Sequence, residues 1–138
     1  LSSSSAASDV YKRQEVAGAA ASLIAKGVDC LNNFTDNNVV DNLAQVLHLT
    51  DEAGIPVFGS EVEQVVNGCL ATEGIDYVAL GRQAGLMAAS ILRGEAEPAT
   101  TPVLLVDECT PAYNSEVAAR LGIALPDAYA AAQDVKAE

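Results

Sequence analysis

The chain has little positive charge and no long apolar run. Seven Lys and Arg residues stand against nineteen Asp and Glu residues in 138, which gives a net charge of −12. Such an excess of negative charge opposes the phosphate contacts that dominate nucleic-acid affinity and the attraction to anionic lipid. No apolar run approaches the roughly 20 residues that a bilayer-spanning helix needs. We therefore expect neither nucleic acid nor a membrane surface as a partner, and no direct membrane insertion of this chain.

Side chains that bind metals or form redox pairs are also scarce. Cys30, Cys69 and Cys109 are far apart, and no two have the two- to four-residue spacing of a zinc or redox site. Each lies in or beside an apolar, strand-like run, so we expect all three to be buried as small hydrophobic residues. The single His48 lies in a helical pattern without a second histidine, and we expect it to face solvent or to be partly buried. The sequence implies no metal and no cofactor.

The first residues differ from the rest of the chain. Residues 4–14 read SSAASDVYKRQ, which resembles one reading frame of the transposon-end adapter used to prepare sequencing libraries. On this interpretation residues 1–14 are a non-native tail, the biological sequence begins near Glu15, and what preceded it was lost. The alternative is an ordinary tail rich in Ser and Ala. Because an artificial segment must be excluded from fold reasoning, the fold is predicted from Glu15 onward.

From Glu15 onward, helical and strand-like patterns alternate, as in βα units built on a parallel sheet. Hydrophobic residues make up 50% of the chain, enough for one domain with a core. Expected strands lie at 28–34, 56–59, 69–71 and 103–106. Expected helices begin near Val16, Val39, Val62, Tyr77 and Ser115, with ends near Gly27, Gly54, Asn67, Gly94 and Gly122. The tail from Leu125 is expected to be a turn with weak helicity. The predicted class is α/β with a doubly wound parallel sheet.

The most informative stretch runs from Gly68 to Gly94. A short apolar strand at 69–71 is expected to break at Thr72–Gly74, and Asp76 then provides an N-cap for a long helix. Apolar residues recur along this helix at three- and four-residue steps, and small residues suited to close packing lie among them. Such a helix is expected to have a partner surface.

Polar residues follow three of the expected strands. They are Thr35–Asn38, Gly59–Glu61 and Thr72–Asp76. Ligands of open α/β sheets bind beyond the carboxyl ends of the strands, so these hydroxyl, amide and carboxylate groups favour a site for a small polar or zwitterionic molecule. The alternative is that Asp36, Asn37 and Asp76 merely cap helices. No nucleophile elbow and no phosphate loop is present in the sequence.

Three segments together carry a family resemblance. GVDCLNNFTDNNVV, EAGIPVFGSE and GCLATEGIDYVALGRQAGLMAASILRGE resemble the carboxyl-terminal part of ABC-transporter substrate-binding proteins of the tryptophan/tyrosine type, over about Val16 to Pro126. The resemblance implies the type I periplasmic-binding fold, in which two doubly wound lobes close on a ligand. It also implies a non-enzymatic, extracytoplasmic protein, periplasmic or lipid-anchored, that delivers its ligand to ABC permease subunits. The signal region would lie outside this chain.

The resemblance further implies a division of the chain. Residues 15–76 would form βα units of the second lobe, 77–93 a crossover helix of the first lobe, 94–126 the return to the second lobe, and 127–138 a tail. The helix at 77–93 would then lack the lobe against which it packs. We therefore expect this chain alone to be marginally stable, sticky or oligomeric, because the lost burial is comparable with the net stability of a domain.

By position, the resemblance assigns ligand binding to a small set of residues at the strand ends. The set is Thr35, Asp36, Asn37, Ser60, Glu61, Glu73 and Asp76. The sequence departs from the family's pattern at Asn32, Asn33 and Glu73, which leaves the ligand open: an amino acid, with aromatic ones suggested by the family name. The alternative function is a doubly wound lyase or isomerase that uses Asp36 and Asp76 as acid and base.

Overall fold

The computed structural model describes residues 15–105 and 109–136. The described residues divide into two compact units, one containing residues 15–74 and 111–136 and the other residues 75–105 and 109–110. Each unit is described by itself below. The interpretation of residues 4–14 as an adapter lies outside the described residues and stays a prediction.

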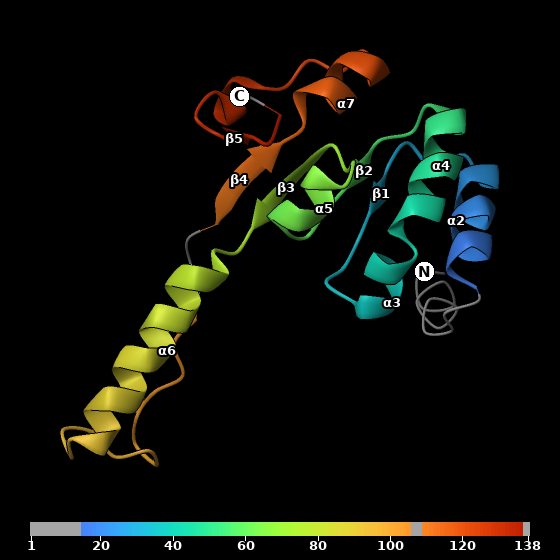
Figure 1. The fold of residues 1–138 in the computed structure, drawn as a ribbon. Coiled ribbons are helices and arrows are strands. Elements are labelled where there is room, and N and C mark those ends of the chain that lie inside the picture. Colours follow the sequence, from blue (N-terminus) through green and yellow to red (C-terminus); the bar gives the residue numbers. More distant parts are fainter. Residues whose placement is uncertain (1–14, 106–108, 137–138) are drawn as a thin grey trace. The chain divides into compact units, whose positions relative to one another are not determined.

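The first unit is built on a sheet whose five strands lie in the order of the sequence (Figure 1). The strands are β1 (Leu31–Asn32), β2 (Val57–Phe58), β3 (Ala71–Gly74), β4 (Thr110–Tyr113) and β5 (Gln133–Asp134). The pairs β1 with β2, β2 with β3 and β4 with β5 are parallel. The predicted α/β class with a mostly parallel sheet is therefore confirmed.

Short helices connect these strands. They are α2 (Val16–Ala25), α3 (Asn37–Asp41), α4 (Leu43–Ala53), α5 (Val62–Val66), α7 (Ser115–Leu121) and the 3-10 turn η1 (Asp127–Tyr129). Gly54 and Gly122 end α4 and α7 with φ values of 68° and 66°, a left-handed conformation that glycine adopts at little cost. Helices α2 and α4 lie side by side next to β1 (Figure 1).

Most of the buried apolar residues of the first unit belong to one of two clusters. One joins α2, α4 and α5 to the first strands through Val16, Ala20, Leu31, Leu43, Val46, Val57, Val65 and Cys69. The other joins Leu70 and Ala71 to Val117 and Ala118 of α7. The Thr50 hydroxyl is also buried, but it donates to the carbonyl oxygens of Val46 at 3.0 Å and Leu47 at 3.1 Å. Its polarity is thus satisfied within α4.

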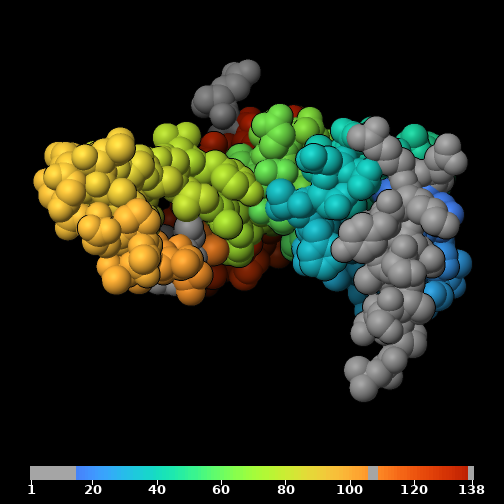
Figure 2. Space-filling model, turned by 90° about the horizontal axis from the view of Figure 1, so that it is seen from below, coloured from blue at the N-terminus to red at the C-terminus, as the bar shows by residue number. Residues whose placement is uncertain are grey.

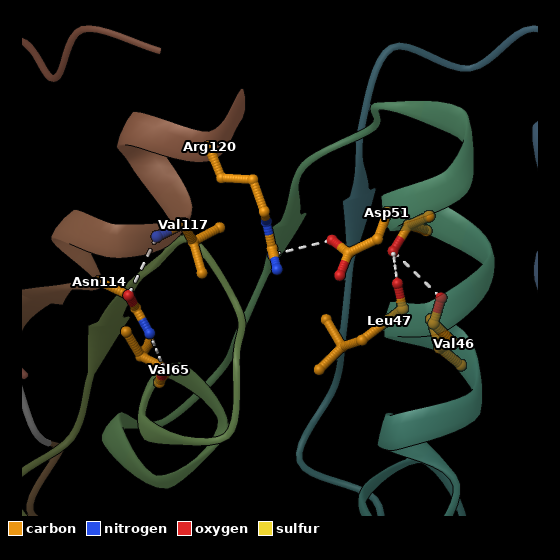
Figure 3. A network of polar contacts seen from close by, with 8 residues as sticks. Val46, Leu47, Asp51, Val65, Asn114, Val117 and Arg120 are labelled. Atoms are coloured by element: carbon orange, nitrogen blue, oxygen red, sulfur yellow. Dashed lines mark hydrogen bonds and ion pairs between the residues drawn. The ribbon is translucent and has the colours of Figure 1, made fainter. Parts of the chain in front are cut away.

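A buried asparagine connects three elements of this unit. Asn114 is 1% exposed. Its Oδ1 accepts from the Val117 amide at 3.1 Å, which caps α7, and its Nδ2 donates to the Val65 carbonyl at 3.1 Å. At the surface, Arg120 of α7 reaches Asp51 of α4 at 2.8 Å (Figure 3). The end of β4 is thus tied to α5 and α7 by hydrogen bonds that the core shields from water.

The second unit contains one long helix. Helix α6 (Tyr77–Leu92) begins at Asp76, whose Oδ1 accepts from the amides of Val78 and Ala79, each at 2.9 Å. It ends before Gly94, which has a φ of 73°. The predicted helix and cap are confirmed. The chain from Pro98 to Leu104 runs back beside α6 (Figures 1 and 2). Its residues line a groove together with those of the helix. No residue of α6 is buried.

Two strand predictions were wrong. Thr72–Gly74, expected to break the third strand, belong to β3, and Cys69 and Leu70 precede it. Val103–Leu105 form no strand; Val103 and Leu105 are 86% and 79% exposed, and residue 106 lies outside the described residues. The next strand is β4, where Ala112 is fully buried. An apolar run forms a strand only where a neighbouring strand offers hydrogen bonds, and Leu70 offers its carbonyl to the Asn114 amide at 2.9 Å.

Three smaller expectations also need correction. The tail contains the strand β5, because the Val135 amide donates to the Tyr113 carbonyl at 2.9 Å. The helix expected from Val39 to Gly54 is interrupted at Asn42, which separates α3 from α4. Of the three cysteines, Cys69 is buried as predicted, whereas Cys30 and Cys109 are exposed. His48, expected to face solvent or to be partly buried, is exposed.

Candidate functional site

The carboxyl ends of β1, β2 and β3 share one edge of the sheet and open into a cleft of about 400 Å³. In parallel α/β sheets this edge is where ligands bind. The lining residues come from the ends of these strands, the loops after them and η1: Asn32, Asn33, Phe34, Phe58, Gly59, Ser60, Ala71, Thr72, Glu73 and Tyr129. Amide, hydroxyl and carboxylate groups here lie beside three aromatic rings.

The loops after β1 and β2 are connected through one hydroxyl. Thr35 Oγ1 donates to Ser60 Oγ at 2.9 Å, and Gln64 Nε2 donates to the same oxygen at 3.1 Å. Gln64 Nε2 also approaches the Phe34 carbonyl at 3.5 Å. Because Ser60 Oγ accepts twice, its own proton remains available to donate toward the cleft.

A glycine makes this arrangement possible. A Cβ at Gly59 would lie 2.9 Å from Gln64 Cβ, closer than van der Waals contact allows. Gly59 therefore lets the end of β2 approach α5 closely enough for Gln64 to hydrogen-bond Ser60. The side chain of Gln64 is almost fully buried, at 1% exposure.

Two buried polar atoms have no hydrogen-bond partner among the described residues. They are Gln64 Oε1 and Thr72 Oγ1. Gln64 adjoins Ser60, and Thr72 lines the cleft. A buried polar atom without a partner costs about 1–3 kcal/mol, so a polar partner supplied from outside the chain would be stabilised at this edge.

The site residues expected from the sequence occupy different positions. Ser60 and Glu73 line the cleft, and Thr35 hydrogen-bonds Ser60. Glu61 immediately precedes α5 and is half-buried; a Cβ at Gly74 would lie 3.4 Å from its Cα. The structure thus brings Thr35, Ser60, Glu61 and Glu73 to one edge of the first unit.

The three remaining candidates are located at helix starts. Asp36 caps α3 by accepting from the Asn38 amide at 2.8 Å, and the exposed Asn37 is the first residue of that helix. Asp76 caps α6 in the second unit. Capping, the alternative considered for these residues, accounts for the hydrogen bonds of both aspartates.

Sequence reasoning missed Tyr129 altogether. It lies in a tail where we expected only a turn, yet it lines the cleft. Burial raises the pKa of the Tyr129 hydroxyl, and the Glu73 carboxylate raises it further by hydrogen bonding and by its negative charge. An aromatic residue in an Ala-rich tail was a signal that could have identified it.

Asn33, noted in the sequence only as a departure from a family pattern, also lines the cleft. Its Nδ2 lies 3.9 Å from Cys69 Sγ. Burial raises the pKa of the Cys69 thiol to about 12, against the weaker opposing effect of the Asn33 hydrogen bond. This thiol is therefore neutral and forms part of the core.

A larger hollow of about 630 Å³ lies elsewhere on the first unit. Residues of α4 and α7 line it together with Asn67 and Gly68, which precede β3. It is therefore at the amino-terminal end of that strand, away from the edge where parallel sheets bind ligands.

Comparison with known proteins identifies relatives of this chain. The sequence pattern of the family described as "ABC transporter substrate binding protein" matches residues 6–136, beginning inside the segment that resembles an adapter. A tyrosine-binding protein of Clostridioides difficile is 39% identical over 94 residues, which are 68% of this chain and 27% of that protein.

Solved structures agree with these matches. The ABC domain in complex with L-Trp from Streptococcus pneumonia has a TM-score of 0.75 and 27% identity, over 88% of this chain and 41% of that one. A ligand-free, open substrate-binding protein with adhesive properties from Clostridium difficile has a TM-score of 0.70 and 32% identity, over 92% and 42%. A conserved domain protein from Vibrio cholerae has a TM-score of 0.74 and 30% identity, over 88% and 40%.

This chain thus spans about a quarter of the length of the curated relative and about two fifths of the solved structures. The family pattern nevertheless extends over nearly all of it. The resemblance noted in the sequence is confirmed: the chain belongs to the family of ABC transporter substrate-binding proteins and is similar to tyrosine- and tryptophan-binding members.

Proposed function

We propose that this chain is part of the substrate-binding component of an ABC importer, which captures an amino acid and delivers it to permease subunits without catalysing a reaction. The family match over residues 6–136 supports this function. The relatives that bind tyrosine and L-Trp support an amino acid as ligand, aromatic ones included.

The observation that carries the proposal is the cleft at the carboxyl ends of β1, β2 and β3. Ser60 offers a hydroxyl donor, Glu73 a carboxylate that accepts from an ammonium or hydroxyl group, and Phe34 with Phe58 an apolar surface. Polar groups beside aromatic rings suit a zwitterion with an apolar side chain. The other proposed ligand-binding residues are Thr35, Asp36, Asn37, Glu61 and Asp76.

The division into lobes is part of the proposal. The first unit would be the second lobe of the binding protein, and α6 a crossover helix that packs against a first lobe. The ligand would be held between the two lobes. The apolar residues of α6 support this, because none of them is buried. We place the protein outside the cytoplasm. Among the described helices, none combines the length and apolar character needed to cross a membrane.

The enzyme alternative has weaker support. Asp36 and Asp76, its acid and base, belong to different units, and each accepts backbone amide hydrogen bonds at the start of a helix. A carboxylate whose oxygen accepts hydrogen bonds from its own helix start is poorly placed to exchange protons with a substrate. The family is one of substrate-binding proteins.

Calorimetry on a chimera tests the proposed function. Residues 15–136 would replace the matching segment of the tyrosine-binding protein, so that the cleft faces a complete first lobe. We expect tryptophan or tyrosine to bind and a simple sugar to give no heat. Ser60→Ala should weaken binding about fivefold, the loss of one hydrogen bond of about 1 kcal/mol. Ser22→Ala, on the exposed side of α2, is the matched control. Failure to bind any amino acid would refute the proposal.

A further inference from the structure

One wall of the cleft combines a carboxylate with aromatic rings. Among the described residues that line the cleft, only Glu73 carries a charge, and Phe34, Phe58, Ala71 and Tyr129 supply apolar surface. Glu73 follows Thr72, whose buried hydroxyl oxygen has no hydrogen-bond partner within residues 15–105 and 109–136. The wall therefore offers hydrogen-bond acceptors in apolar surroundings, and no cationic side chain that could bind a ligand carboxylate.

The protonation state of the Tyr129 hydroxyl bears on how many hydrogen bonds the Glu73 carboxylate can still accept from a ligand. The pKa of Tyr129 is raised by burial and then by Glu73, so the phenol keeps its proton at neutral pH. A carboxylate has about four acceptor positions, of which one phenol can occupy only one. Glu73 lines the same cleft as Tyr129 and therefore still has room to accept a donor from a ligand.

The apolar surroundings indicate which part of a ligand reaches this wall. An α-ammonium and α-carboxylate are both charged and are better satisfied beside the Thr35 and Ser60 hydroxyls. An aromatic or long apolar side chain suits the space between Phe34, Phe58 and Tyr129, where ring faces and edges attract one another. A donor at the end of such a side chain would meet Glu73.

We propose that Glu73, oriented by Tyr129, determines specificity by requiring a hydrogen-bond donor on the ligand's side chain, so that tyrosine or tryptophan binds more tightly than phenylalanine. The inference rests on the proposed function and adds to it the class of side chain and the residues that select it. A site that has placed a carboxylate for a ligand donor binds an analogue without that donor more weakly, because the carboxylate then loses water without gaining a hydrogen bond from the ligand.

The first test measures the interaction between Glu73 and Tyr129 in the full 138-residue chain. The phenol of Tyr129 is titrated by NMR with ring-labelled tyrosine and assigned through Tyr129→Phe. Glu73→Gln should lower the pKa of Tyr129, because it removes the negative charge that opposes ionisation. Glu63→Gln, an equally exposed glutamate on α5, should leave it unchanged. An unchanged titration in Glu73→Gln would overturn the inference.

The second test measures selectivity in the chimera described above. We expect wild type to bind tyrosine at least about tenfold more tightly than phenylalanine, a difference of about 1.4 kcal/mol. Glu73→Met, which keeps the length but removes the acceptors, should abolish most of this ratio, and Tyr129→Phe should reduce it. Glu63→Met and Tyr113→Phe are the matched controls.

The outcomes separate this inference from the proposed function. If Glu73→Met weakens tyrosine and phenylalanine by the same factor, or leaves both unchanged, the specificity role is refuted while amino-acid binding stands. If the wild-type chimera binds no amino acid, both fail. If Glu73→Met no longer unfolds cooperatively on heating, the selectivity of Tyr129→Phe tests the inference instead. That substitution removes a single oxygen atom and is therefore expected to leave the fold intact.

Discussion

The two units of this chain contain similar apolar residues, which are buried in the first unit and exposed in the second. In the first unit Leu70 is 1% exposed and Val65 is fully buried. In the second, Val78 and Leu92 of α6 are 84% and 87% exposed, and no residue of the helix is buried. The difference shows that apolar periodicity predicts a helix whether or not its partner is present. Burial, and with it most of the stability, depends on the partner surface.

The same contrast applies to the helix caps. Asn114 caps α7 from a buried position and also donates to the Val65 carbonyl, so it connects three elements. Asp76 caps α6 from an exposed position and bonds only within its own helix start. Asn114 therefore stabilises tertiary structure and Asp76 local structure, although both are residue types that commonly cap helices.

The largest expected difference in stability is between truncating a buried leucine in the first unit and truncating an exposed leucine on α6. Leu70→Ala should lower the free energy of unfolding by about 2–5 kcal/mol, because it opens a cavity in the core. Leu86→Ala, at a position on α6 that is 62% exposed, should change it by less than about 0.5 kcal/mol. Urea denaturation followed by circular dichroism measures both. Equal losses would show that α6 is packed in solution.

Removal of the two helix caps should produce a smaller difference in stability than the two leucine substitutions. Asn114→Ala should cost about 1–3 kcal/mol of global stability, since it removes the cap of α7 and the buried hydrogen bond to the Val65 carbonyl, which then keeps only the Gly68 amide. Asp76→Ala should cost about 1 kcal/mol, expressed as fraying of α6. Hydrogen exchange at the first turns of α7 and α6 distinguishes the two. A global loss of protection in Asp76→Ala would contradict this separation.

The cysteines offer a pH-dependent comparison. The pKa of Cys69 is raised from 9.0 to about 12 in the folded chain, so unfolding lets this thiol ionise at lower pH. Its contribution to stability is fully present below about pH 9 and falls as the pH rises toward 12. Cys69→Ala should therefore flatten the alkaline decline of the unfolding free energy. A thiol reagent should modify the exposed Cys30 and Cys109 in the native chain and Cys69 only after unfolding.

Charged substitutions on the exposed surface of α6 should have the smallest effect on stability and a clear effect on self-association and dye binding. In the chain alone, Leu92→Lys combined with Val78→Lys should reduce binding of an apolar dye and self-association, while the free energy of unfolding changes by less than about 0.5 kcal/mol. Dye fluorescence and sedimentation velocity are the measurements. A wild-type chain that is monodisperse and binds no dye would refute the prediction that this face is sticky.

Much of the fold could be predicted because its signals are local. The cap at Asp76 and the glycines at 54 and 122 each act within one turn of the helix that they begin or end. The apolar periodicity of α6 likewise lies within the helix itself. The polar strand ends could also be located, since a parallel sheet brings them to one edge.

The remaining parts could not be predicted because they depend on distant partners. Strand β5 has two residues and exists only through its pairing with β4, and that pairing accompanies the placement of Tyr129 near Glu73. The apolar run at 103–105 lacks such a pairing and forms no strand. Cys30 and Cys109 lie beside apolar runs, yet burial is decided by what packs over them rather than by their sequence neighbours.

Hydrogen exchange on the chimera, with and without tryptophan, tests the central claim that the edge at the carboxyl ends of β1, β2 and β3 binds the ligand. We predict slower exchange on ligand addition in peptides that cover residues 32–37, 59–64 and 71–76, with residues 116–121 of α7 unchanged. Protection confined to α4 and α7, or bound tryptophan with no protection at the three strand ends, would contradict the assignment of the site.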